Sequence, residues 1–163
     1  MGYTLEAVIG ASDAVAAGAA RCPGAVVVPL WGNLSLVPMT DELFDAVTDR
    51  TSARPLGFWK LPGGFDRTLA SWSAVGPVGY VEAEFFGGVG SQRAVLWVAG
   101  EVALGPVHIG EGEPVAPAGS PISQLLAHLG IERAGDRDEF EVAGLDRHRG
   151  TDDWLSETGS EAS

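Results

Sequence analysis

Residues 77–104, PVGYVEAEFFGGVGSQRAVLWVAGEVAL, contain three runs rich in apolar residues, separated by turns that contain glycine. In the first run apolar and polar residues alternate up to Phe86, the pattern of a strand that has one buried face. The second run covers residues 92–98 and the third covers residues 101–104. The stretch therefore predicts a three-stranded meander, and it sets the fold class of the chain.

Further strands are expected upstream of this meander. Residues 5–9, LEAVI, read as an opening strand, and the apolar runs at residues 25–31 and 34–37 flank the pair Gly32-Asn33. A Gly-Asn pair between two β-branched runs is typical of a hairpin turn. Together with the meander, these runs predict a mixed or antiparallel sheet of about six strands.

Helices are expected where a capping residue precedes an apolar stripe. Thr40 precedes Asp41 and Glu42, whose negative charges suit the first turn of a helix. The other predicted helices cover residues 13–20 after Ser12, residues 65–75, and residues 121–130 after Ser120. Residues 105–119 hold three prolines and are predicted as a loop. The chain is therefore predicted to be α+β, with three to four helices packed mainly on one face of the sheet.

The length of 163 residues suits one domain. Apolar residues near the C-terminus, among them Phe140 and Trp154, indicate that this segment docks on the domain as far as Leu155. Residues 156–163 are mostly small and polar, which is typical of a disordered end. We therefore predict one globular domain over residues 1–155 and a disordered tail over residues 156–163.

Charge and cysteine content narrow the class of protein. The formal net charge is −12 and the chain has a single lysine, Lys60, so it lacks the clustered cations that grip nucleic acid. No apolar run reaches the length that a membrane span requires. The single cysteine, Cys22, cannot form an internal disulfide, and the first residues lack the charge pattern of a secretory signal. A cytoplasmic location is the resulting expectation.

The negative charge is concentrated toward the C-terminus. Residues 132–163 hold 10 acidic and 4 basic residues, so half of the net charge lies in the last fifth of the chain. An acidic surface speeds the encounter with a cationic partner, and an aromatic side chain in a loop buries a large area when it is bound. We therefore predict a basic protein partner. The candidate partner-binding residues are Trp59, Glu82, Glu84, Asp138, Glu139, Asp152 and Asp153.

Glu82 and Glu84 share one face of a predicted strand, where two carboxylates could hold a divalent cation or act as an acid–base pair. The alternative interpretation is a solvent-facing strand that keeps the sheet soluble. With His148 and Asp152, the two glutamates form the alternative metal-binding set. No spacing matches a specific metal, nucleophile or cofactor motif, so we predict no catalytic residue and no cofactor.

Residues 87–90, GGVG, raise the possibility of a phosphate-binding loop. A strand rather than a helix is predicted to follow them, and the Gly-Lys-Ser/Thr ending of such loops is missing. These glycines are therefore interpreted as a β-turn or bulge.

Three stretches resemble an uncharacterised family of small bacterial proteins: VEAEFFGGVGSQ at residues 81–92, LVPMTD at residues 36–41, and the ending from residue 147 to residue 155. The resemblance covers nearly the whole chain and implies no activity. In size and charge alone, the chain is also similar to the immunity proteins of bacterial toxin systems.

Three functions follow from these observations as hypotheses. The first is a small acidic protein-binding module, an immunity-type inhibitor that neutralises a basic toxin or effector protein. The second is a small metal-dependent enzyme or metal-binding protein that uses Glu82 and Glu84 with His148 or Asp152. The third is a structural subunit that assembles through an exposed strand edge. The sequence leaves the oligomeric state open.

Overall fold

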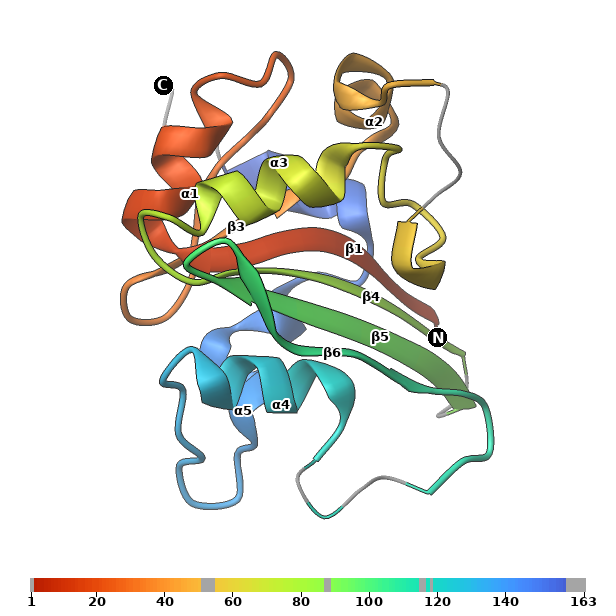
Figure 1. The fold of residues 1–163 in the computed structure, drawn as a ribbon. Coiled ribbons are helices and arrows are strands. Elements are labelled where there is room, and N and C mark those ends of the chain that lie inside the picture. Colours follow the sequence, from red (N-terminus) through yellow and green to blue (C-terminus); the bar gives the residue numbers. More distant parts are fainter. Residues whose placement is uncertain (1, 51–54, 87–88, 115–116, 118, 158–163) are drawn as a thin grey trace.

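The structure is a computed structural model that describes residues 2–50, 55–86, 89–114, 117 and 119–157. Six strands form one sheet in the order β2-β3-β1-β4-β5-β6, and every neighbouring pair is antiparallel (Figure 1). Their bounds are β1 Gly2–Ala11, β2 Val28–Pro29, β3 Leu34–Pro38, β4 Val78–Phe86, β5 Val89–Val98 and β6 Glu101–Ile109. The α+β class and the antiparallel sheet are confirmed, and the meander forms as β4, β5 and β6.

Helices cover both faces of the sheet, whereas we had expected them mainly on one face (Figure 1). One face carries α1 (Ser12–Ala19), α2 (Asp41–Val47) and α3 (Phe65–Trp72). The other carries α4 (Pro121–His128) and α5 (Glu139–Ala143). Short 3₁₀ helices at Pro55–Gly57, Leu145–Arg147 and Thr151–Trp154 complete the helical elements of the described residues.

The side chains of the central strands divide between two apolar cores, one on each face. Leu5, Ala7 and Ile9 of β1 pack with α4, α5 and Trp154 on one side. Val8 of the same strand packs with α1 and α3 on the other side. Because β1 and β4 are buried on both faces, they are apolar over long runs, and a polar residue inside them stands out.

The C-terminal segment docks on the domain, as predicted. Trp154 is fully buried, and the main chain of Arg149 accepts a hydrogen bond of 2.8 Å from the Thr4 amide. Strand β3 pairs only with Ala7–Ala11 of β1. The contact with Arg149 lies on the earlier part of β1, which β3 does not reach. Residues 156 and 157, predicted as the start of a disordered tail, belong to the described part of the chain, and the Glu157 carboxylate contacts His148. Residues 158–163 lie outside the described part of the chain.

Other differences are local. The predicted loop at residues 105–119 is wrong at its start, because β6 continues through Pro106 to Ile109. Ser12 does not cap α1: it is the first helical residue, and its hydroxyl lies 2.9 Å from the Ser35 hydroxyl. Thr40 and Ser120 do cap α2 and α4, each accepting a bond from the amide three residues later. The turn expected at residues 87–90 lies partly outside the described residues. None of the helices in the described ranges combines the length and the apolar character that a membrane span requires.

Candidate functional site

A row of three charged residues crosses the centre of the sheet on the face that carries α2 and α3. Glu6 of β1 lies opposite Glu82 of β4, and Glu82 lies opposite Arg93 of β5. In antiparallel strands, side chains directly opposite one another are close neighbours, so the two carboxylates face each other. This face of the sheet therefore holds two acidic groups side by side, next to apolar residues of the core such as Val8 and Tyr80.

Glu82 is 1% exposed. The alternative interpretation, in which this residue faces solvent, is therefore wrong for Glu82. Its carboxylate accepts hydrogen bonds from the amides of Trp59, at 2.6 Å, and Lys60, at 2.5 Å. The Tyr80 hydroxyl, on the same strand face, donates to the Lys60 carbonyl at 2.8 Å. Strand β4 thus holds the segment at residues 59–60 by three polar contacts, and it fixes where Trp59 and Lys60 emerge.

The Glu82 carboxyl group has a pKa raised to about 7. Burial raises this pKa most, because the charged form loses its hydration, and the negative charge of Glu6 raises it further. The two amide hydrogen bonds and the nearby Arg93 lower it in part. Glu82 therefore changes its charge near neutral pH, directly beneath Trp59 and Lys60.

A pocket of about 440 Å³ opens beside this segment. Its lining comprises Glu6, Asp41, Phe44, Asp45, Trp59 and Lys60. Trp59 is 42% exposed, a large value for a tryptophan in a folded chain. Three carboxylates, two aromatic rings and one ammonium group therefore surround the pocket.

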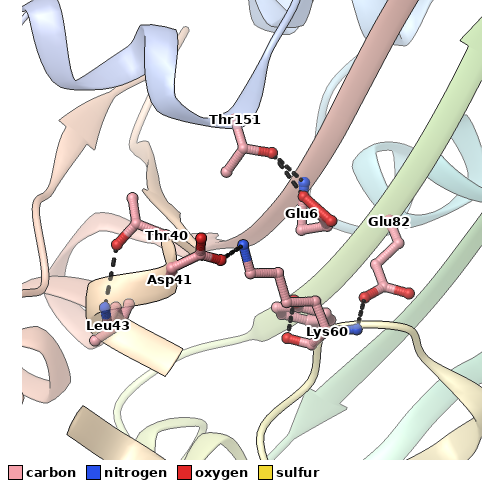
Figure 2. A network of polar contacts seen from close by, with 8 residues as sticks. Glu6, Thr40, Asp41, Leu43, Lys60, Glu82 and Thr151 are labelled. Atoms are coloured by element: carbon pink, nitrogen blue, oxygen red, sulfur yellow. Dashed lines mark hydrogen bonds and ion pairs between the residues drawn. The ribbon is translucent and has the colours of Figure 1, made fainter. Parts of the chain in front are cut away.

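The single lysine is already engaged within the pocket. Its Nζ lies 2.6 Å from Asp41 Oδ1, and this contact lowers the pKa of the Asp41 carboxyl group. Figure 2 shows the Lys60 side chain reaching Asp41 while its backbone nitrogen faces Glu82. Asp41 and Asp45 stand four residues apart on α2, on the same side of the helix, so Asp45 adds a further negative charge.

The C-terminal segment completes the surroundings of Glu6. The Glu6 amide donates to Thr151 Oγ1 at 3.0 Å, and the Thr151 hydroxyl donates to Glu6 Oε1 at 2.9 Å (Figure 2). The Glu6 carbonyl accepts from the Met39 amide at 2.8 Å, just before Thr40 caps α2. One residue on β1 therefore links the pocket to both α2 and the C-terminal segment.

The structure gathers only part of the predicted partner-binding set. Trp59 lines the pocket and Glu82 supports it from below, but the buried Glu82 carboxylate cannot itself touch a partner, which corrects that prediction. Glu84, Asp152 and Asp153 are exposed. Asp138 and Glu139 lie at α5 on the opposite face of the sheet, where Asp138 caps the helix and Glu139 pairs with Arg133.

Five residues of the pocket lining were not predicted as site residues: Glu6, Asp41, Phe44, Asp45 and Lys60. The sequence contains a signal for two of these residues. Lys60 is the only lysine, and Glu6 interrupts an apolar strand. The register that sets Glu6 against Glu82 joins residues 76 positions apart and could not be inferred from local spacing.

The alternative metal set is not assembled. His148 Nε2 lies 2.5 Å from Glu157 Oε2, and its ring packs edge-on against Trp154 at 4.7 Å. Glu82 is engaged by backbone amides, and Glu84 and Asp152 are exposed. Within the described ranges, no group of three or more His, Cys, Asp or Glu side chains could hold a metal ion.

Comparison with known proteins adds no relative: no family model, no curated protein and no solved structure matches this chain.

Proposed function

We propose that this chain is an acidic protein-binding module whose pocket receives a lysine or arginine side chain of a basic partner protein. The observation that carries the proposal is the pocket itself, where Glu6, Asp41 and Asp45 surround a half-exposed Trp59. Carboxylates pair with a cation, and an indole face attracts it through its quadrupole. The one cation on the lining, Lys60, is paired with Asp41, so the remaining carboxylates favour a positive charge from outside.

The proposal extends to the role of an immunity-type inhibitor that neutralises a basic toxin or effector. A net charge of −12 steers a cationic partner toward the surface and raises the association rate. A tight inhibitor also needs a prearranged contact surface, because ordering loops on binding costs affinity. That order comes from the two hydrogen bonds that Glu82 accepts from the amides of residues 59 and 60, and from the one that Tyr80 donates to the Lys60 carbonyl.

Reversing the charge of Asp45 is expected to slow association with the partner by about tenfold or more at low salt. Asp45 is exposed and near the C-terminal end of α2, where a lysine suits the helix dipole, so Asp45→Lys preserves the fold. The matched control is Glu101→Lys, the same charge change on the outermost strand β6. Stopped-flow association measured at several salt concentrations tests the difference.

The partner is sought by affinity capture with three baits, the wild type, Asp45→Lys and Glu101→Lys. A basic protein retained by the wild type and by Glu101→Lys, but lost from Asp45→Lys, would support the proposal once the purified pair shows the rate difference. Equal retention by Asp45→Lys, or a captured partner with an acidic surface, would contradict it.

Replacing Trp59 with alanine is expected to weaken the same complex by at least about tenfold, because a tryptophan at the centre of an interface is a typical hot spot. The free energy of unfolding should change by less than about 1 kcal/mol, since the ring is half exposed and its backbone amide still binds Glu82. Isothermal titration calorimetry and urea unfolding of the two proteins separate these effects. Unchanged affinity would place the contact surface elsewhere.

A further inference from the structure

A second pocket, of about 350 Å³, lies on the opposite face of the sheet at the N-terminal end of α4. Its lining comprises Phe85 and Gln92 from the sheet, Gly119, Ser120 and Ser123 from the start of α4, and Arg133, Asp138 and Phe140 from the segment that follows. None of these residues belongs to the pocket beside Trp59. The two sites are therefore tested independently.

Gln92 offers a fixed donor to this pocket. The residue is 7% exposed, and its Oε1 accepts a hydrogen bond of 3.0 Å from the Ile122 amide. That bond settles the orientation of the side-chain amide, because the oxygen must face Ile122 and the NH₂ group must face away. No residue of the described ranges accepts a hydrogen bond from this NH₂ group.

Ser123 offers a second donor. The residue is 3% exposed, and its hydroxyl makes no hydrogen bond to the described part of the chain. Yet, within that part, no fully enclosed polar side-chain atom lacks a partner. The Ser123 hydroxyl and the Gln92 NH₂ group must therefore be open to the pocket that both residues line. Both donors therefore point into a space that a ligand can enter, and each can donate a hydrogen bond to a ligand oxygen.

The N-terminal end of α4 and the Arg133 guanidinium lie beside these donors, and so do the carboxylates of Asp138 and Glu139. The N-terminal end of α4 carries the positive part of the helix dipole. The backbone amides of Ile122 and Ser123 in the first turn of α4 already donate to Gln92 and Ser120. The side-chain donors, and not these amides, would therefore contact a ligand. Arg133 binds Glu139 through Nε at 3.2 Å, and its Nη2 approaches Gly119 at the edge of the pocket.

The remaining walls are aromatic. Phe85 and Phe140 both pack against Tyr3, with ring centroids 6.0 and 5.5 Å from it. The Tyr3 hydroxyl donates to the Leu145 carbonyl at 2.9 Å, which holds the tyrosine in place behind both rings. Asp138 is engaged in capping α5, accepting from the Glu141 amide at 3.0 Å. The pocket thus has a donor-rich end and an apolar end.

We propose that this pocket binds a small organic monocarboxylate with an apolar body. The carboxylate would accept from Gln92 Nε2 and Ser123 Oγ near Arg133, and the body would lie between Phe85 and Phe140. A single negative charge suits the site better than a phosphate does, because the chain as a whole is strongly acidic and repels multiply charged anions.

The test uses phenylacetate as the probe and its neutral isostere phenylacetamide as the comparison. In ¹H–¹⁵N spectra of the full chain, phenylacetate is expected to shift the amide signals of Gln92, Ser120, Ile122 and Ser123 with a Kd of about 1 mM. Nuclear Overhauser contacts should join its ring protons to Phe85 and Phe140. Phenylacetamide should bind at least about fivefold more weakly, and inorganic phosphate should leave these signals unshifted.

Ser123→Ala removes one donor and keeps a residue that favours helices, and it should weaken phenylacetate binding about tenfold. Arg133→Gln is the second variant, with a smaller loss expected because the Arg133 side chain is 61% exposed and already pairs with Glu139. Asp45→Lys, at the other pocket, is the control and should bind the probe as the wild type does. Absence of binding, equal binding of the neutral isostere, or full binding by Ser123→Ala would each overturn the proposal.

Discussion

Replacing Trp154 with alanine is expected to lower the free energy of unfolding by about 3–5 kcal/mol, the usual cost of removing a fully buried aromatic side chain. Trp154 is 0% exposed and belongs to the core formed with β1 and α4. Its ring also contacts His148 edge-on and lies 5.1 Å from the Arg147 guanidinium. Alanine would leave a cavity that these polar neighbours cannot fill.

Urea unfolding of the wild type and the variant measures this loss, with Trp31→Ala as the control. Trp31 is 64% exposed, so the same substitution there should change the free energy of unfolding by no more than about 1 kcal/mol. Equal losses for the two variants would show that the C-terminal segment adds little to the fold. A loss confined to Trp154→Ala would show that this segment is part of the core.

The expected loss has a consequence for the pocket beside Trp59. The segment that Trp154 anchors also supplies the Arg149 carbonyl to Thr4 and the Thr151 hydroxyl to Glu6. When that anchor is removed, Glu6 keeps its place opposite Glu82 but loses a partner for its carboxylate. Stability and site geometry are therefore joined through Thr4 and Glu6 of β1.

The sequence predicted those parts of the fold that local chemistry determines. Thr40 and Ser120 cap helices because their hydroxyls satisfy free amides, and residues 78–86 and 89–98 form strands because their apolar residues must be buried. The apolar residues of the acidic C-terminal segment correctly indicated docking, since Leu145 and Trp154 are fully buried. Each of these features is decided within a few residues.

The site was harder to predict because it depends on pairing between distant elements. Glu82 reads locally as a polar residue on a half-exposed strand, and only the segment at residues 58–60 makes it buried. Similarly, Pro106 reads as the end of a strand, yet an edge strand tolerates a proline because its outer amide needs no partner. The grouping of Glu6, Asp41 and Trp59 arises from three separate elements that no single motif joins.

Replacing Glu82 with glutamine is expected to remove a pH dependence of stability that the wild type shows between about pH 5 and pH 7.5. The Glu82 pKa is raised to about 7 in the folded chain from its ordinary value of 4.5, so between these values the folded protein holds a proton that the unfolded chain has released. The Glu82 contribution to the unfolding free energy therefore decreases as pH rises, by roughly 2 kcal/mol over this range. This direction is opposite to that of an ordinary paired carboxylate.

Glutamine at position 82 turns its NH₂ group toward one of the two backbone amides that now donate to Glu82, so it loses a hydrogen bond at every pH. The test therefore compares the slope of the unfolding free energy against pH rather than its absolute value. Urea unfolding at four pH values compares the wild type with Glu82→Gln and with the control Glu84→Gln, an exposed position two residues further along β4. The wild type and Glu82→Gln differ only in the side chain at position 82, so the difference in slope between them reports on the Glu82 carboxyl group. If the unfolding free energies of the wild type and Glu82→Gln change with pH in parallel, burial does not raise the pKa of Glu82. If Glu84→Gln follows the wild type and Glu82→Gln does not, a carboxyl group beneath Trp59 changes charge near neutral pH.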